Sequence, residues 1–274
     1  MLNLKLLRHT DKKNFFLIAG PCVVENEIIT LKTAEKIYSL CEKYKIPFIF
    51  KSSYKKANRS KLDSFATIGE TKALSILKQV KKEFKIPILT DIHSPEEAKL
   101  ASDYDVDILQ IPAFLSRQTE LLVAAGKTFK YINIKKGQFM SPEAMKFAAQ
   151  KVESTGNRKI LLTERGTFFG YQDLVVDFRS IPIMKKTNYN VVTDITHSLQ
   201  KPNQTSGITG GNPELIETLG RAAIAAGSDG IFLETHPNPT EALSDGANML
   251  PLNKLDKLLH NLVIIKQAVN NILT

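Results

Sequence analysis

Eight short apolar runs recur along the chain, and each ends in polar or turn-forming residues. Their apolar residues follow one another instead of alternating with polar ones, which is typical of strands buried on both faces of a parallel sheet. The runs read FFLIAG, PFIFKSS, IPILTDI, VDILQIPA, YINIKKG, KILLTERG, NVVTDITH and GIFLETH. Helical patterns separate or follow most runs, over residues 26–45, 67–84, 95–103, 117–127, 141–154, 213–226 and about 253–272. Eight such strands with intervening helices predict an α/β protein with the (β/α)8 TIM-barrel fold.

The whole chain, 1–274, is expected to form a single barrel domain with a short N-terminal extension of about residues 1–14. A doubly wound open sheet is the alternative, but no glycine-rich dinucleotide fingerprint follows the first run. Residues 170–189 are apolar enough to pack, and we expect them to form the helix after the sixth strand. Residues 198–212 contain three Gly, a Pro and no apolar stripe, so we expect a mobile lid loop there.

The composition excludes several classes of protein. Hydrophobic residues make up 43% of the chain and charged residues 24%, as in an ordinary soluble globular protein. No apolar stretch reaches the roughly 18–20 residues that a membrane span needs. The N-terminus, MLNLKLLRHTDKKNFF, lacks the long apolar region and cleavage site of a secretory signal. We therefore expect a cytoplasmic protein without a membrane partner.

The formal net charge is +9, which invites a nucleic-acid partner. The lysines, however, are scattered over many segments and form no basic tract with interleaved aromatic residues, so no nucleic-acid binding is expected. A solvated, lysine-rich surface would explain the net charge without implying that the charge serves a function. An anionic small substrate is the sharper explanation, because positive potential raises its local concentration.

Polar or reactive residues follow every apolar run, at the point where each predicted strand ends. In chain order they are Cys22, Lys51, Asp91, Gln110 with Pro112, Lys135 with Lys136, Glu164 with Arg165, Asp194 with His197, and Glu234 with His236. In a barrel of parallel strands all these positions meet at one face, where enzymes of this fold build their active sites. The sequence therefore predicts an active site at the carboxyl ends of the strands.

Cationic residues form the first chemical group at this face: Lys51, Lys56, Arg59, Lys135, Lys136 and Arg165. They would repel one another unless anions lay among them, and arginine and lysine both bind phosphate or carboxylate. One or two substrates with several negative charges are therefore expected. Lys55 and Lys61 are instead expected to belong to the solvated surface.

Cys22, His197, Glu234 and Asp245 form the second group. A thiol, an imidazole and two carboxylates suit a transition metal such as Zn²⁺ or Fe²⁺, unlike the all-oxygen ligands of Mg²⁺. The competing interpretation makes Cys22 a nucleophile activated by a histidine. The chain contains no GxSxG, HExxH or P-loop motif, and Cys41 lies in a helical pattern that places it in the core.

From about residue 15 to 260 the sequence resembles the 3-deoxy-D-manno-octulosonate 8-phosphate synthases, also called 2-dehydro-3-deoxyphosphooctonate aldolases. The matching blocks are FKSSYKKANRS, TDIHSP, QIPAFLSRQTELL, INIKKGQFMSPEAM, ERGTFFGYQDLVVDFRSIPIMK, TDITHSLQ, FLETHPNP and SDGANMLPL. The resemblance implies condensation of phosphoenolpyruvate with arabinose 5-phosphate and release of inorganic phosphate, in making the inner-core sugar of lipopolysaccharide. It also suggests a homotetramer.

The resemblance implies a role for many strand-end residues. Lys56, Asn58, Arg59 and Ser60 match the segment that contacts arabinose 5-phosphate. Gln110, Lys135, Arg165 and the backbone near Ala113 match positions that hold phosphoenolpyruvate. Asp91 resembles the residue near the reacting sugar and Lys51 one at the floor of the site. The implied catalytic residues are Lys51, Asp91, Lys135 and His197.

The family has a metal-dependent and a metal-independent subclass. Metal-independent members have Asn at the position of Cys22 and the sequence CDG at positions 244–246. This chain has Cys22 and Ser244-Asp245-Gly246, so it is similar to the metal-dependent subclass. The implied ligands of a Zn, Fe or Mn ion are Cys22, His197, Glu234 and Asp245. For Asp194 and His236 two roles stay open, a supporting or packing role and direct ligation.

Three rival functions stay open at this point. The nearest is a 3-deoxy-arabino-heptulosonate 7-phosphate synthase that uses erythrose 4-phosphate, although such enzymes typically have a KPRT-like segment where this chain reads KKANRS. The others are a barrel that has lost catalysis and binds anions or nucleic acid, and a binding module with only a structural metal.

Overall fold

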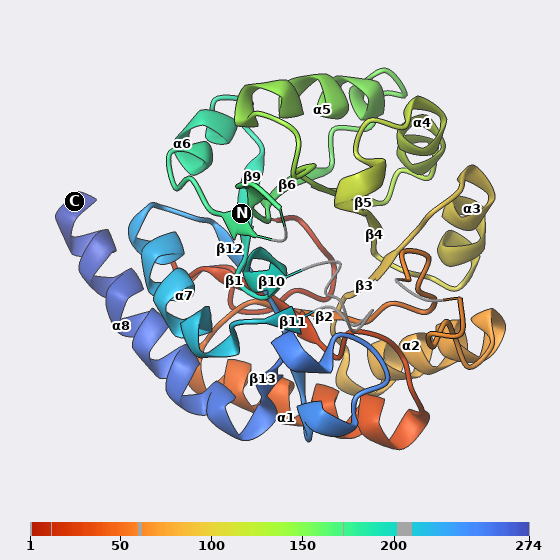
Figure 1. Cartoon of the computed structure of the whole chain (residues 1–274), viewed down its shortest axis with the longest axis horizontal. Helices are drawn as coiled ribbons and strands as arrows, with labels where there is room; N and C mark the ends of the chain where they lie inside the picture. The colour runs from red at the N-terminus through yellow and green to blue at the C-terminus, as the bar shows by residue number, and fades with distance from the viewer. Residues whose placement is uncertain (1, 12, 60–61, 172, 202–209, 274) are drawn as a thin grey trace.

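The computed structural model describes residues 2–11, 13–59, 62–171, 173–201 and 210–273. Within these residues, eight parallel strands form the central sheet (Figure 1). They are β1 (Phe16–Gly20), β2 (Phe48–Lys51), β3 (Ile88–Asp91), β4 (Ile108–Ile111), β5 (Tyr131–Lys135), β6 (Ile160–Glu164), β9 (Asn190–Asp194) and β12 (Gly230–His236). β1 pairs with β12, Phe16 opposite Gly230, so the sheet closes into a barrel. The predicted (β/α)8 barrel is confirmed and the open sheet was wrong.

Helices surround the barrel as an outer ring (Figure 1). They are α1 (Glu27–Tyr44), α2 (Glu70–Phe84), α3 (Pro95–Asp103), α4 (Thr119–Lys127), α5 (Met145–Glu153), α6 (Ser180–Lys185), α7 (Ile216–Ala225) and α8 (Leu255–Leu273). The Asn26 side chain caps α1 by accepting a hydrogen bond from the Ile29 amide at 2.8 Å. α1 and α2 both end at a lysine in the left-handed conformation, Lys45 and Lys85, and in each case an Ile-Pro pair links that lysine to the next strand.

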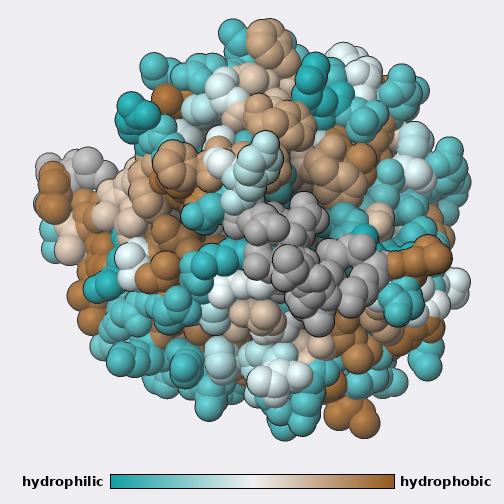
Figure 2. Space-filling model, in the orientation of Figure 1, coloured by the Kyte–Doolittle hydropathy of each residue, from teal (hydrophilic) through white to brown (hydrophobic). Residues whose placement is uncertain are grey.

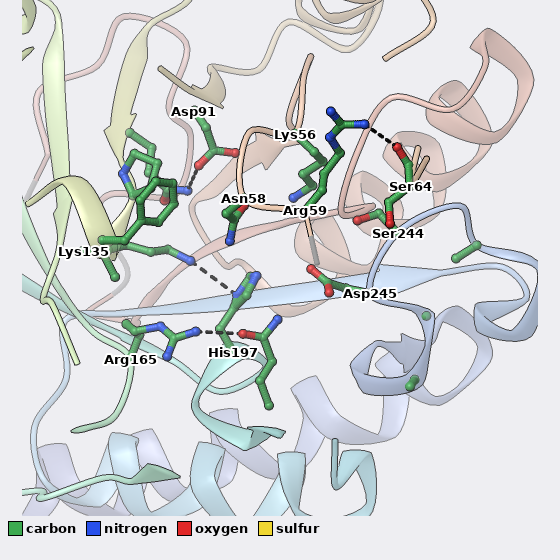
Figure 3. Close-up of a pocket in the computed structure, with 18 of the residues that line it drawn as sticks. Lys56, Asn58, Arg59, Ser64, Asp91, Lys135, Arg165, His197, Ser244 and Asp245 are labelled. Carbon is green, nitrogen blue, oxygen red and sulfur yellow. Dashed lines mark hydrogen bonds between the residues drawn. The ribbon is translucent and has the colours of Figure 1, made fainter. Parts of the chain in front are cut away.

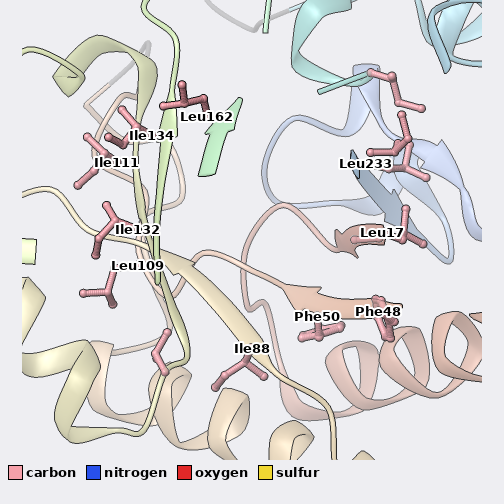
Figure 4. Packing of buried hydrophobic residues seen from close by; sticks show 14 of the residues in the cluster. Leu17, Phe48, Phe50, Ile88, Leu109, Ile111, Ile132, Ile134, Leu162 and Leu233 are labelled. Carbon is pink, nitrogen blue, oxygen red and sulfur yellow. The ribbon is translucent and has the colours of Figure 1, made fainter. Parts of the chain in front are cut away.

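Buried apolar side chains form two separate groups, because successive side chains of a strand point to opposite faces of the barrel wall. The outer group joins one face of every strand to the helices, and Figure 4 shows members such as Leu17, Phe50 and Leu233. The inner group fills the barrel itself with Phe16, Ile18, Ile49, Leu89, Ile108, Leu161, Val192 and Phe232.

Two residues beyond the inner apolar group, the side chains on the same face become polar. We call these residues the polar layer: Lys51, Asp91, Gln110, Asn133, Thr163, Asp194 and Glu234. Each is at most 7% exposed. The barrel interior therefore has an apolar floor near the amino ends of the strands and a buried polar layer above it, towards their carboxyl ends.

The N-terminal segment covers the opposite, amino end of the barrel. Leu2 and Leu7 are buried and pack in the same cluster as the inner apolar residues, with Leu4 partly buried beside them. The Asn3 amide donates to the hydroxyl of Tyr131 on β5 at 2.9 Å. The predicted extension thus contributes apolar side chains to the floor of the barrel.

The segment after β6 differs from the prediction of a helix over 170–189. It begins with an antiparallel hairpin of β7 (Thr167–Phe168) and β8 (Leu174–Val175), and of its described residues only those of α6 are α-helical. The reason is that apolar residues of the first half face solvent, since Phe169 is 70% and Tyr171 100% exposed. They therefore cannot form the buried stripe that a barrel helix needs.

The predicted lid loop, 198–212, lies partly outside the described residues. Its described ends, β10 (Gln200–Lys201) and β11 (Gly210–Gly211), pair as antiparallel strands. A further short strand, β13 (Leu250–Pro251), pairs with the end of β12. Among the residues that the structure describes, no helix is long and apolar enough to cross a membrane. Figure 2 shows hydrophilic residues interspersed with hydrophobic ones over the face that Figure 1 presents.

Candidate active site

A cavity of about 980 Å³ lies at the carboxyl end of the barrel, above the polar layer. Its wall includes polar-layer residues together with the loops that follow β2, β4, β5, β6, β9 and β12 (Figure 3). Of the predicted substrate-binding and catalytic residues, those that line it are Lys51, Lys56, Asn58, Arg59, Asp91, Gln110, Ala113, Lys135, Arg165 and His197. Ser60 and Lys61 lie outside the described residues. The structure thus brings together residues that are far apart in the sequence.

Two arginines lie at this cavity with different surroundings. Arg59 donates from its NH1 atom to the carbonyl oxygens of Leu62 and Ser64, at 2.8 and 2.7 Å, which fixes the loop after β2. Arg165 donates from NH2 to Gln200 Oε1 at 2.8 Å. The NH1 atom of Arg165 is buried without a hydrogen-bond partner among the described residues, so it is a donor available to an anion in the cavity.

Two buried lysines at the floor of the cavity share one aromatic ring. Lys135 Nζ donates to Asp194 Oδ2 at 2.6 Å and lies 3.8 Å from the centre of the Phe232 ring. Lys51 Nζ lies 2.5 Å from Glu234 Oε1 and 5.4 Å from the same ring. Burial lowers the pKa of Lys135, and the Asp194 carboxylate opposes this change. Both cations are therefore held by a carboxylate and by the face of Phe232.

Asp91 is the carboxylate that β3 contributes to the polar layer. It accepts hydrogen bonds from Ser53 Oγ and from Gln110 Nε2. Although burial raises the pKa of Asp91, the charges of Lys51 and Lys56 outweigh it and hold the pKa below its usual range. Asp91 is therefore an ionised acceptor at the cavity wall.

Three of the four predicted metal ligands lie together at the cavity, whose wall includes Asp245. The ligand atoms of Cys22, Glu234 and Asp245 are all within 4.8 Å of one another. Cys22 Sγ is 3.3 Å from Asp245 Oδ2, and Asp245 itself has a left-handed backbone with φ of 50°. Burial raises the pKa of the Cys22 thiol, and the Glu234 charge adds to this effect.

His197 reaches the same cluster from the loop after β9. Its Nε2 atom is 3.5 Å from Glu234 Oε2, and its Nδ1 atom is 2.7 Å from Asp194 Oδ2. Asp194 thus holds the ring so that Nε2 faces the other predicted ligands, as a supporting residue of a metal site does. Burial raises the pKa of Glu234, but the charges of His197 and Lys51 outweigh it and hold the pKa at about 2.

The donor set fits a divalent transition metal. Glu234 Oε2 is buried without a hydrogen-bond partner among the described residues, and a buried carboxylate oxygen needs a cation or a donor. Thiolate, imidazole and carboxylate together suit Zn²⁺, Fe²⁺ or Mn²⁺. His236 lies farther out, with Nδ1 2.7 Å from the Asn238 carbonyl oxygen and Nε2 3.5 Å from Glu25 Oε2.

Two residues predicted for this face point elsewhere. Lys136 donates to Thr167 Oγ1 at 2.9 Å and lies 3.4 Å from Glu164 Oε1, so the two strand-end residues pair with each other outside the barrel wall. The physical reason is the two-residue period of a strand: Lys135 and Thr163 face inward, so their neighbours Lys136 and Glu164 face outward. The prediction that Lys136 belongs to the cationic group was therefore wrong.

Two predictions outside the cavity can also be compared with the structure. Lys55 was expected on the solvated surface, and its side chain is 31% exposed while pairing with Glu70 at 2.8 Å and Glu97 at 3.2 Å. Cys41 is 2% exposed and packs in the outer apolar group, which confirms its core position.

Several cavity residues were missed from the sequence. His93, Phe114, Gln138, Phe139, Phe168 and Gln200 all line the wall. His93 directly follows the predicted run IPILTDI, so its position was a usable signal. The aromatic residues lie between the barrel strands and the helices that follow them, in segments without periodicity, and no sequence signal places them there. Asn133 and Thr163 were missed as well, although a polar residue inside an apolar run is itself unusual.

Comparisons with known proteins agree over nearly the whole chain. Residues 5–271 match the DAHP synthetase I family. The chain is 52% identical over 257 residues to the 2-dehydro-3-deoxyphosphooctonate aldolase of Koribacter versatilis, covering 93% of this chain and 92% of that one. It is 51% identical over 253 residues to the enzyme of the same name from Geotalea uraniireducens, covering 92% and 93% of the two chains. The chain therefore belongs to the DAHP synthetase I family and, within it, to the 2-dehydro-3-deoxyphosphooctonate aldolases.

Proposed function

We propose that this protein condenses phosphoenolpyruvate with D-arabinose 5-phosphate and water, giving 3-deoxy-D-manno-octulosonate 8-phosphate and inorganic phosphate. The observation that carries the proposal is the cavity lined by Lys51, Lys56, Lys135 and Arg165, whose charges suit two phosphorylated substrates. The names of relatives at about half identity over more than nine tenths of the chain support it. They do not favour a 3-deoxy-arabino-heptulosonate 7-phosphate synthase.

The two substrates are assigned to two parts of the cavity. Lys135 and Arg165, at the ends of β5 and β6, hold the carboxylate and phosphate of phosphoenolpyruvate. Lys56, Asn58 and Arg59, in the loop after β2, hold the sugar phosphate (Figure 3). The free NH1 donor of Arg165 and the buried ammonium of Lys135 support the first assignment.

The reaction forms one carbon–carbon bond and one carbon–oxygen bond, the latter from water, and breaks the carbon–oxygen bond to phosphate. C3 of phosphoenolpyruvate attacks the aldehyde carbon of the sugar, whose oxygen takes up a proton. Water adds its oxygen at C2 and gives up one proton, which balances the proton taken up by the sugar oxygen. The resulting hemiketal phosphate then expels phosphate by cleavage of the bond between C2 and the bridging oxygen, and its hydroxyl proton leaves with the phosphate, so that C2 becomes a ketone. Lys51 and Lys135 balance the negative charge that develops above the polar layer, and the fixed geometry holds both substrates ready to react.

We further propose that Cys22, His197, Glu234 and Asp245 bind a Zn, Fe or Mn ion, as in the metal-dependent subclass. Such an ion supplies concentrated positive charge, which orients the sugar or acidifies the attacking water. The support is the grouping of three ligand atoms within 4.8 Å, with His197 Nε2 beside them. The Asp194 carboxylate accepts a hydrogen bond from His197 Nδ1, which leaves Nε2 available.

The resemblance also motivates two proposals about the protein in the cell. We propose a cytoplasmic homotetramer. The exposed aromatic residues of the β7–β8 hairpin, Phe168, Phe169 and Tyr171, support an interface there.

The test is release of phosphate from phosphoenolpyruvate plus arabinose 5-phosphate, measured on chelator-treated protein before and after addition of Mn²⁺ or Zn²⁺. Activity that returns only with metal supports both the reaction and the metal site. Full activity in rigorously stripped protein keeps the reaction and overturns the metal role. No release with any metal overturns the reaction, and release with erythrose 4-phosphate would establish the rival enzyme instead.

A further inference from the structure

Four side chains of the polar layer form a continuous hydrogen-bonded row across four neighbouring strands. Thr163 Oγ1 on β6 donates to Asn133 Oδ1 on β5 at 2.6 Å, and Asn133 Nδ2 donates to Gln110 Oε1 on β4 at 2.8 Å. Gln110 Nε2 then donates to Asp91 Oδ1 on β3. Asn133 and Thr163 are fully buried, and Gln110 and Asp91 are 2% and 7% exposed.

All hydrogen bonds of the row run from donor to acceptor in one direction, towards Asp91, because Asp91 is ionised. A carboxylate only accepts hydrogen bonds, so Gln110 must present its amide nitrogen to Asp91. The Gln110 oxygen then faces Asn133, which must present its own nitrogen, and the Asn133 oxygen must face a donor. Thr163 is that donor, because its hydroxyl can rotate to supply a proton. Every member is satisfied only when all bonds point towards Asp91.

The two ends of the row differ in their access to substrate. Asp91 and Gln110 line the cavity, whereas Asn133 and Thr163 are sealed within the barrel wall. Because the Gln110 nitrogen carries two protons and Asp91 takes one, the row leaves the second as a donor at the cavity that Lys135 and Arg165 also line. A reversed Gln110 amide would instead set its oxygen against Asp91 and repel an anion in the cavity.

We propose that Asn133 and Thr163 are positioning residues, which act through Gln110 to keep a donor on Asp91 and on the bound phosphoenolpyruvate. The inference rests on the proposed function for the identity of that anion. Strand register supports it, since Asp91 lies opposite Gln110 and Gln110 opposite Asn133 in the ladder. The links from Asn133 to Asp91 are therefore built into the strand pairing, and Thr163, which lies opposite Lys135, reaches Asn133 diagonally from the next strand.

The experiment compares Asn133→Leu with Asn157→Leu, and Thr163→Val with Thr163→Ser. Asn157 is a matched control, because it is a buried asparagine whose amide donates to the Gly126 and Lys130 carbonyl oxygens away from the cavity. For each protein, kcat, the KM of both substrates, the Kd of phosphoenolpyruvate by calorimetry and the melting temperature are measured.

Asn133→Leu is expected to lower kcat/KM by about 10- to 100-fold and to weaken phosphoenolpyruvate binding, because a hydrogen bond to a charged group is lost or reversed. The KM for arabinose 5-phosphate should stay within about twofold. Asn157→Leu should lose stability and keep the wild-type kinetic constants. Thr163→Val should lower kcat/KM by about 3- to 10-fold, and Thr163→Ser, which keeps the hydroxyl, should restore it.

Two results would overturn the role of the row. One is a kinetic loss in Asn133→Leu that Asn157→Leu reproduces at equal loss of melting temperature, since the effect would then be one of stability. The other is identical behaviour of Thr163→Val and Thr163→Ser. If the wild type released no phosphate, the proposed function would fail separately, and the Kd of phosphoenolpyruvate across the same variants would still decide whether the row orients Gln110.

Discussion

Cys22 and Cys41 are both buried, yet only one has reactive neighbours. Cys41 packs among apolar side chains between α1 and the barrel. Cys22 lies beside Glu234, Asp245 and Ser244 at the end of β1. The pair therefore offers a direct comparison of a thiol in a proposed metal site with one in an apolar core.

We expect Cys22→Ser to lose metal and Cys41→Ser to keep it. Changing even a supporting residue of a metal site weakens affinity by about 10- to 100-fold, so losing a direct ligand should cost at least about 100-fold. Metal per chain after dialysis, measured by elemental analysis, checks this without using activity. Equal metal content in both variants would contradict the assignment of Cys22 as a ligand.

Glu97 gives a pH-dependent contribution to stability. Burial raises its pKa, but hydrogen bonds from His93 outweigh this and lower the pKa from 4.5 to about 2. A depressed carboxyl pKa stabilises the fold above the unfolded value and loses that contribution as pH falls through the folded value.

We therefore expect the free energy of unfolding of Glu97→Gln to be about 2 kcal/mol below that of the wild type at neutral pH. The difference should shrink as pH falls below 4.5 and vanish near pH 2. Urea unfolding of both proteins over this range measures it. A difference that stays constant with pH would show that the Glu97 charge is not involved.

Single residues of the site were predictable where a chemically unusual side chain ended an apolar run. Lys51, Asp91 and Glu234 stood out because a buried strand rarely carries a charge. Their partners did not stand out, because which carboxylate meets which lysine depends on barrel closure. The pairing of Lys51 with Glu234 joins β2 to β12 across β1, and no local pattern contains it.

Among the elements, strands were predicted better than the segments between them. Each strand is specified by a short apolar run, whereas the segment after β6 contains apolar residues that face solvent and so imitate a helix. Knowing which alternate residues of each strand face inward would also have excluded Lys136 from the cationic group, since it lies one residue beyond the inward-facing Lys135. Which residues face inward is set by the register between neighbouring strands, and the sequence of a single apolar run does not contain it.

The N-terminal segment is an element whose contribution can be measured alone. Leu7 is 9% exposed and packs against the inner apolar group, at the end of the barrel away from the cavity. Leu7→Ala should lower the free energy of unfolding by about 2 kcal/mol, because it leaves apolar space at the barrel floor. Thermal or urea unfolding measures the loss, and kcat/KM should stay unchanged.

Ile28→Ala is the control for this change, since Ile28 is 79% exposed and should alter stability by no more than about 0.5 kcal/mol. Equal stability of Leu7→Ala and the wild type would show that the segment does not seal the barrel.

For the whole molecule, the exposed aromatic residues of the β7–β8 hairpin predict association. Phe169 and Tyr171 are 70% and 100% exposed, an unfavourable arrangement for a chain that stays alone in water. Replacing both with Ser should shift sedimentation from a tetramer towards smaller species while the circular dichroism of the barrel is kept. A wild-type protein that sediments as a monomer at micromolar concentration would contradict the proposed homotetramer.

The polar layer has a consequence for how this fold can change. Each of its side chains comes from a different strand and rests on an apolar residue two positions earlier on that strand. The polar layer therefore supplies the reactive groups, while the apolar residues below it pack the inside of the barrel. A redesign for a new substrate can leave the lower apolar residues unchanged. The polar residues have to be changed in groups, the four members of the hydrogen-bonded row together and Lys51 together with its partner Glu234.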